Sequence, residues 1–138
     1  GVGPAAFRTE FSGNAGTLAK ILGAVFGKTE VANEVYAGIG LYYIDAGMTY
    51  ESLMQLAIDA RLGVGASHPA VVDLLYTNVV GVPPSDGDRG YFVGLLDSGA
   101  YTVAGLGVMA ADIDLNVANI DLVGLAQQGL EYTPYLGG

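Results

Sequence analysis

The side chains of this sequence that could do chemistry are mainly aspartates, and they gather in two stretches. The first stretch is "GVPPSDGDRGYFVGLLDSGAY", residues 81–101. Within it Asp86, Asp88 and Asp97 stand at positions 1, 3 and 12 of a calcium-binding loop. Calcium is held by about six to eight oxygens, several of them carboxylates on one loop. These three aspartates are therefore calcium candidates.

The same stretch also reads as the start of a helix. Position 6 of the loop is Tyr91, where a calcium loop of this kind needs glycine, and the apolar run that begins there has helical spacing. Ser85 can cap a helix, and Asp86 and Asp88 would then lie in the first turn, where the helix dipole favours negative charge. Asp97 would help to form the following turn. The residues favour this capping interpretation, with calcium as the alternative.

The second stretch is "DIDLN", with Asp112 and Asp114 followed by Asn116 and Asp121. Its Asp-x-Asp-x-Asn pattern is similar to a calcium loop, but no glycine follows and no acidic residue closes it. The N-terminus of a helix explains the same residues. Calcium is thus the only cofactor to which the sequence points, and it could act as a weak bridge between acidic copies of the chain.

Other chemistries lack the residues that they need. The chain has no cysteine, and His68 is its only histidine. No serine stands in a nucleophile elbow, and no glycine-rich segment has the strand and helix of a phosphate or dinucleotide site. We therefore expect no catalytic residues, no bound organic cofactor and no enzyme activity.

Composition indicates what surrounds the chain. Its 138 residues carry a net charge of −9, which disfavours nucleic acid, and no apolar run is long enough to insert into a membrane. Charged residues make up only 14 % of the chain, against about 25 % in typical soluble domains, and the mean hydropathy is +0.44. Because a domain of this size cannot bury all of that apolar surface, we expect a homo-oligomer or lattice.

Tyrosines offer a second kind of partner. The chain has nine of them, and aromatic platforms can stack on sugars, so a glycan remains an alternative ligand. Most lie on apolar helix faces, where packing is the commoner role. Tyr132 and Tyr135 lie instead in the tail, residues 129–138, which we expect to be extended and to supply interface anchors.

Helical periodicity runs through nearly the whole chain and predicts an all-α bundle of about six to seven short helices. The first apolar stripe covers residues 18–26, and the last helix is expected over residues 116–128, with Gly129 after its end. The expected N-caps between them are Thr29, Thr49, Ser67, Ser85 and Thr102. The expected inward faces are Val31, Val35, Ile39 and Tyr42 in the second helix, Leu53, Leu56, Ala57 and Ala60 in the third, and Tyr91, Phe92, Leu95 and Leu96 in the fifth.

Two segments of the sequence are similar to each other. "YYIDAGMTYESLMQLAID" and "GLLDSGAYTVAGLGVMAAD" align with Asp45 and Asp97 separated by 52 positions, and with Leu53 and Leu106 separated by 53. We therefore expect one domain of two related helical modules, at about residues 17–62 and 67–128.

The second module resembles the bacterial family catalogued as domain of unknown function 4214. The shared pattern is carried by Leu75-Tyr76, Gly81, Tyr91-Phe92, Leu96 and Ser98-Gly99. The chain departs from the pattern at Val82, Ser85, Asp88 and Phe92, where the family has arginine, aspartate, glycine and tryptophan. The resemblance covers about forty residues well and the first module only faintly.

This resemblance implies a secreted or cell-surface bacterial setting, often beside calcium-binding repeats or in S-layer-like proteins, and implies no activity. Together with the composition it predicts a non-enzymatic structural protein of the bacterial surface or extracellular matrix that assembles with itself. The alternative is a glycan- or calcium-binding module of a larger secreted protein.

Overall fold

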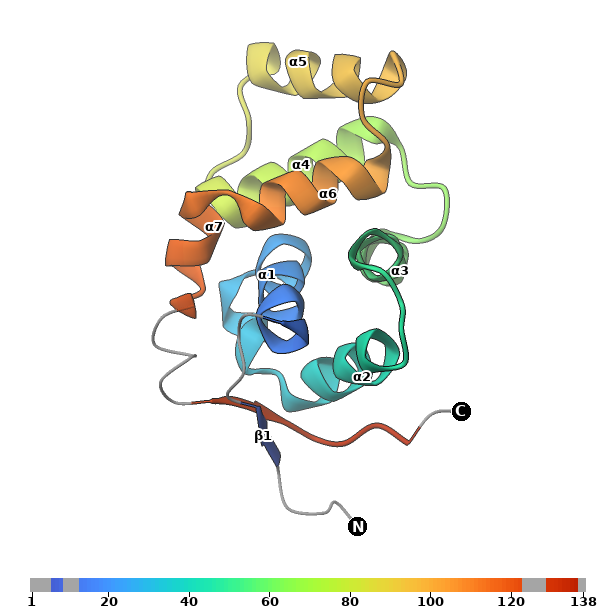
Figure 1. Cartoon of the computed structure of the whole chain (residues 1–138). Helices are drawn as coiled ribbons and strands as arrows, with labels where there is room; N and C mark the ends of the chain where they lie inside the picture. Colours follow the sequence, from blue (N-terminus) through green and yellow to red (C-terminus); the bar gives the residue numbers. More distant parts are fainter. Residues whose placement is uncertain (1–5, 9–12, 123–128, 137–138) are drawn as a thin grey trace.

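The computed structural model describes residues 6–8, 13–122 and 129–136, and these residues form seven α-helices that confirm the all-α prediction (Figure 1). None of the described helices is both long and apolar enough to cross a bilayer. The helices are α1 (Asn14–Phe26), α2 (Glu34–Asp45), α3 (Tyr50–Leu62), α4 (His68–Val80), α5 (Asp86–Asp97), α6 (Val103–Asp112) and α7 (Asp114–Asn119), with a 3₁₀ segment at Lys28–Ala32.

A two-stranded antiparallel sheet joins the two ends of the chain. Strand β1 (Ala6–Arg8) pairs with β2 (Leu130–Tyr132), and Ala6 lies opposite Tyr132. The sequence suggested no strand pairing, because hairpin signals are sought between neighbouring segments and these strands are far apart in sequence. The extended conformation expected for the tail is found in β2.

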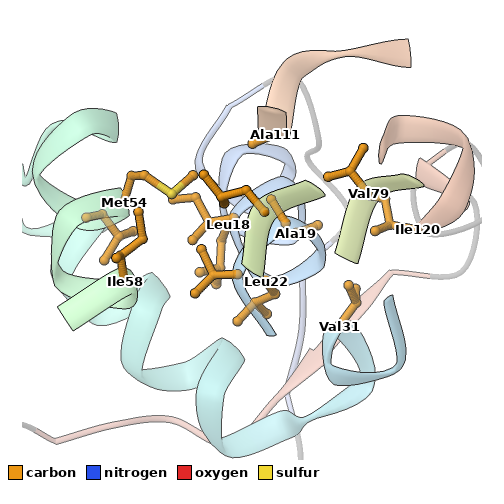
Figure 2. Packing of buried hydrophobic residues seen from close by; sticks show 14 of the residues in the cluster. Leu18, Ala19, Leu22, Val31, Met54, Ile58, Val79, Ala111 and Ile120 are labelled. Atoms are coloured by element: carbon orange, nitrogen blue, oxygen red, sulfur yellow. The ribbon is translucent and has the colours of Figure 1, made fainter. Parts of the chain in front are cut away.

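Helix α1 is the centre of the molecule. Nine of its thirteen residues are buried, and it packs against α2, α3, α4, α6 and α7. Alanine and glycine make up much of the helix, so that neighbouring elements can approach its backbone closely. Figure 2 shows Leu18 and Leu22 of α1 at the middle of the core, with Met54 and Ile58 of α3 on one side and Val79 and Ile120 on the other.

The predictions for the second helix were wrong in two respects. Its N-cap is Asn33, whose side chain accepts from the backbone N–H of Tyr36 over 3.1 Å, and the chain from Thr29 onward belongs to the 3₁₀ segment. The expected apolar stripe is also not the buried face, since Val35 and Tyr42 are 55 % and 42 % exposed. The residues of α2 that are buried are Ala37, Gly38, Gly40, Leu41 and Ile44.

Glycine explains this difference. A Cβ on Gly40 would lie 2.1 Å from the side chain of Leu18, so the backbone of α2 itself is pressed against α1. A search for stripes of large apolar residues misses such a face, because the contact depends on the absence of a side chain at glycine.

The inward face of the third helix was also partly wrong. Leu53 is buried as expected, but Leu56 is 41 % exposed and Ala60 is exposed, while Met54 and Ile58 are buried. The cause is again a glycine, because a Cβ on Gly107 of α6 would lie 2.6 Å from Met54. Because α6 approaches so closely, α3 presents to the core the face that carries Met54 and Ile58.

The N-caps predicted for the remaining helices are confirmed. Thr49, Ser67, Ser85 and Thr102 each accept a hydrogen bond from the backbone N–H three residues further on. The single helix expected over residues 116–128 is wrong, because α7 begins at Asp114 and a turn follows it, where Asp121 has a φ of 51°. Residues 123–128 lie outside the described part. Gly129 has a positive φ of 87°.

The helices recur with the order and spacing of the two similar sequence segments. Helices α1 and α4 both have 13 residues and begin 54 positions apart, while α2 and α5 both have 12 and begin 52 apart. Gly47 and Gly99 close the equivalent turns, with φ of 109° and 80°, by donating to Ile44 and Leu96 over 3.1 Å. We refer to α1–α3 as module one and to α4–α6 as module two.

Candidate interaction surface

Helix α5 differs from its equivalent α2 in how it is covered. It packs mainly on α4, and Leu96 is its only buried residue (Figure 1). The expectation that Tyr91, Phe92 and Leu95 also face inward was wrong for Tyr91, which is 65 % exposed. Phe92 and Leu95 are half-buried. One side of the helix therefore faces solvent.

Polar contacts hold α5 on α4. The guanidinium of Arg89 donates to Asp73 over 2.7 Å and to Asp86 over 3.0 Å. The hydroxyl of Tyr76 donates to Asp88 over 3.0 Å, and this hydrogen bond raises the pKa of Tyr76. These contacts fix the rotation of α5 and so determine which side chains it exposes.

The exposed face of α5 is almost bare of side chains. It contains Gly87, Gly90 and Gly94 beside Tyr91, and no atom from outside the helix lies within 4 Å of where a Cβ on Gly90 or Gly94 would stand. Residues 90–96 carry no charge. Glycine in a helix costs about 1 kcal/mol relative to alanine, so three of them on one exposed face weaken the helix without a packing gain from the described part of the chain.

The other helical glycines whose surroundings are described behave differently. The space that a Cβ would fill is occupied by another side chain or by backbone at Gly23, Gly38, Gly40, Gly105 and Gly107. These five glycines are therefore contact points, and those of α5 differ from them. We refer to the side of α5 formed by Gly87, Gly90, Tyr91 and Gly94 as the open face.

Each module also contains an apolar groove between its three helices. The groove of module one encloses about 200 Å³ and that of module two about 110 Å³. Nine of the residues that line the second groove are equivalent, at the offsets of their helices, to residues that line the first. The pairs are Leu18 and Val72, Ile21 and Leu75, Leu22 and Tyr76, Phe26 and Val80, Gly40 and Phe92, Leu53 and Leu106, Leu56 and Met109, Ala57 and Ala110, and Ala60 and Ile113.

One of these pairs distinguishes the packing of α5 from that of α2. Where module one has Gly40, which lets α2 touch α1, module two has Phe92, whose ring lies 6.3 Å from that of Tyr76. The aromatic pair holds α5 away from α4. The linings contain tyrosine hydroxyls as their only ionisable groups, so these grooves suit apolar contacts rather than acid–base chemistry.

The calcium candidates of α5 are not brought together. Asp86 and Asp97 stand at opposite ends of the helix, about 16 Å apart along its axis. Asp88 accepts from Tyr76, and a carboxylate oxygen of Asp97 lies 2.6 Å from the Nδ1 atom of His68. The capping interpretation of Ser85 describes this helix start, since Ser85 accepts from the N–H of Asp88 over 3.1 Å.

The second aspartate cluster is dispersed as well. Asp112 accepts from Lys20 over 2.9 Å and from the hydroxyl of Tyr50 over 2.8 Å, which ties α6 to α1 and α3. Burial, and then the hydrogen bond to Asp112, raise the pKa of Tyr50. Asp114 is exposed at the start of α7, whereas Asn116 is 1 % exposed and points inward. In the part of the chain that is described, no three histidine or acidic side chains gather as metal ligands would.

Asn116 is a structural residue that the sequence did not reveal as such. Its amide donates to the carbonyl of Lys20 over 3.1 Å and to that of Ala111 over 2.8 Å, so it joins α7 to α1 and α6. Its Oδ1 atom, which has no hydrogen-bond partner among the described residues, faces Gly23. An asparagine in a run of aspartates signals a helix start, and only the fold shows that its side chain is buried.

The two tail tyrosines have contacts within the chain. The ring of Tyr135 meets that of Tyr42 edge to face at a centroid distance of 5.1 Å and lies tilted against that of Tyr43 at 6.2 Å. Tyr132 is half-buried against the core. Their expected role as interface anchors is not tested by these contacts, but they show that the tail is held against α2.

Comparisons of the chain with protein-family models, curated proteins and solved structures found no match, so its similarity to the family of domain of unknown function 4214 stays a prediction.

Proposed function

We propose that this protein is a non-enzymatic structural subunit of the bacterial cell surface or extracellular matrix, which assembles with copies of itself. The observation that carries the proposal is the open face of α5. Three glycines and an exposed tyrosine form a surface that no other element of the described chain covers, whereas in the equivalent helix α2 the tail covers Gly38.

Physical reasoning connects this surface to assembly. Helical glycines lower stability unless a close contact compensates for them, and the other helical glycines whose surroundings are described have such contacts. A strongly acidic protein associates most easily where its surface carries no charge. The low content of charged residues is in keeping with apolar surface that a partner covers. The secreted, cell-surface setting rests on the family resemblance alone.

The test is light scattering after size exclusion, in excess calcium and again in excess chelator. We expect particles much larger than the 14.1 kDa monomer under both conditions. Particles that form only with calcium would make the dispersed aspartates functional in assembly. A monomer under both conditions, at all accessible concentrations, would contradict the proposal and direct attention to glycan binding.

A pair of variants identifies the surface. Tyr91→Ser removes the exposed ring of α5, and Val64→Ser removes a side chain that is 89 % exposed in the loop between α3 and α4. Tyr91→Ser should reduce the particle size and Val64→Ser should leave it unchanged. An equal effect of both variants would indicate general stickiness rather than a specific contact.

A further inference from the structure

Module one shows what covers a helix of this type. The extended tail lies along a row of α2 formed by Glu34, Gly38 and Tyr42. The backbone N–H of Thr133 donates to the carbonyl of Glu34 over 2.9 Å, and its carbonyl oxygen fills the space that a Cβ on Gly38 would occupy. The ring of Tyr135 then meets the ring of Tyr42 edge to face. Gly38 is what allows the backbone of the tail to reach the helix.

Module two has the same row without its cover. At the offset of 52 that relates α2 to α5, the three positions of the row become Asp86, Gly90 and Gly94. All three are exposed, and the space beside both glycines is empty. The row of α5 is therefore at least as open to an extended backbone as that of α2, because glycine replaces tyrosine at its third position.

The tail that covers α2 has a second side that is itself uncovered. Pro134 is exposed, and Leu136 is 93 % exposed. In Figure 1 the tail runs beneath α2 at one end of the molecule and α5 lies at the opposite end, with α1, α4 and α6 between them. The uncovered edge and the uncovered row thus lie at opposite ends of the molecule and do not meet within one chain.

We propose that copies of this chain stack head to tail, with the outer edge of residues 133–136 of one copy lying along the row Asp86, Gly90 and Gly94 of α5 in the next copy. This inference rests on the proposed function and specifies its contact. Because the two surfaces differ and lie at opposite ends, the contact is heterologous, so copies add one after another instead of pairing as a two-fold dimer.

Charge favours a second copy as the occupant. Residues 133–136 are Thr, Pro, Tyr and Leu, and residues 90–96 of α5 are also uncharged. Two molecules that each carry a net charge of −9 can meet along these segments without bringing their carboxylates together. At the start of the row, the carboxylate of Asp86 is already paired with Arg89.

The test uses two variants that each block one side of the contact. Leu136→Ser removes the exposed leucine of the tail and leaves α5 intact. Gly90→Gln fills the row of α5 with a residue that suits a helix and leaves the tail intact. Val64→Ser is the control for Leu136→Ser, since both remove an aliphatic side chain that is about nine-tenths exposed. Light scattering reports the mass of each protein alone and of the two blocked variants mixed in equal amounts.

The expected pattern is specific to a heterologous contact. The parent chain and Val64→Ser form large particles, each blocked variant alone is a monomer of 14.1 kDa, and their mixture forms a species of twice that mass. The mixture restores one intact contact, from the tail of Gly90→Gln to the α5 row of Leu136→Ser, and propagates no further.

Other outcomes overturn the inference in distinguishable ways. A monomeric parent chain overturns both the proposed function and this contact. Large particles of the parent chain and of both blocked variants would leave assembly standing and overturn the contact. Monomeric variants whose mixture stays monomeric would show that the tail of one copy does not bind the α5 row of the next, and would also overturn it. A symmetric α5 contact would make Gly90→Gln alone monomeric while Leu136→Ser still assembles, which overturns it as well. Circular dichroism confirms that both variants keep the helical content of the parent.

Discussion

The Nδ1 atom of His68 lies 2.6 Å from a carboxylate oxygen of Asp97, and this contact joins the first residue of α4 to the last residue of α5. Module one has an equivalent contact in which asparagine takes the place of histidine. The amide of Asn14 donates to Asp45 over 2.8 Å. Asn14 and Asp45 are the first residue of α1 and the last of α2. The two modules therefore share a polar tie between equivalent helix ends as well as their order of helices.

This equivalence predicts which substitution of His68 the fold tolerates. His68→Asn should keep the tie, since asparagine makes it in module one. His68→Ala should remove it and lower the free energy of unfolding by about 0.2–1 kcal/mol, the usual range for exposed pairs. Urea denaturation of both variants checks the difference. Equal losses would show that the contact in module two does not depend on the donor.

Replacing a helical glycine with alanine should change the stability in opposite directions at Gly107, which is packed against α3, and at Gly94, which is not packed. An alanine Cβ at position 107 would lie 2.6 Å from Met54, so Gly107→Ala should destabilise the protein by about 1–3 kcal/mol. At position 94 the space is empty, so Gly94→Ala should stabilise it by about 0.5–1 kcal/mol. Urea denaturation of both variants in the Leu136→Ser background, which we expect to be monomeric, measures the two changes. Changes of the same sign would contradict the packing described here.

Local chemistry made several helix starts predictable. Thr49, Ser67, Ser85 and Thr102 cap their helices because each hydroxyl reaches a backbone N–H three residues along the chain, which requires no knowledge of the fold. The buried face of α2 was not predictable in this way. Its contacts depend on Gly38 and Gly40, and an apolar stripe is recognised only from side chains that are present.

In the candidate site, too, some features follow from the local sequence and others depend on the fold. The sequence identified Asp112 and Asp97 as carboxylates of interest, but it could not identify their partners. Lys20 lies 92 positions from Asp112, and His68 lies 29 positions from Asp97, so only the packing of the helices brings them together. The open face of α5 was hidden for a related reason, since Tyr91 falls on an apolar stripe whether or not a helix lies opposite.

Asn116 predicts a large loss of stability from a small change. Asn116→Leu removes two hydrogen bonds to the carbonyls of Lys20 and Ala111 and should cost about 2–3 kcal/mol. Asn116→Asp should cost more, because it replaces the donating amide with a carboxylate at a position that is 1 % exposed. Asp114→Asn, two residues earlier and exposed, is the control and should change the stability by less than about 0.5 kcal/mol. Thermal unfolding of the three variants ranks them, and a control as damaging as Asn116→Leu would refute the assignment.

The tail strand should respond to pH through Glu131. Partial loss of hydration, and then the nearby carboxyl of Glu34, raise the pKa of Glu131 above its ordinary value of 4.5. A raised pKa in the folded state means that the native protein binds this proton more tightly than the unfolded chain does. The stabilisation is therefore present below about pH 4.5 and is lost as the pH rises through the higher folded-state pKa.

Glu131→Gln should remove this dependence, because glutamine is neutral at every pH and can still donate to the carboxylate of Glu34. Above pH 4.5 the variant should melt at a higher temperature than the parent chain, and below it the two should converge. Glu51→Gln, at an exposed position in the first turn of α3, controls for the loss of one negative charge from the whole molecule. Melting curves at several pH values on either side of 4.5 provide the measurement. If the difference between Glu131→Gln and the parent chain were the same at every pH, the two carboxyls would not be coupled, and the hold of the tail on α2 would not depend on pH.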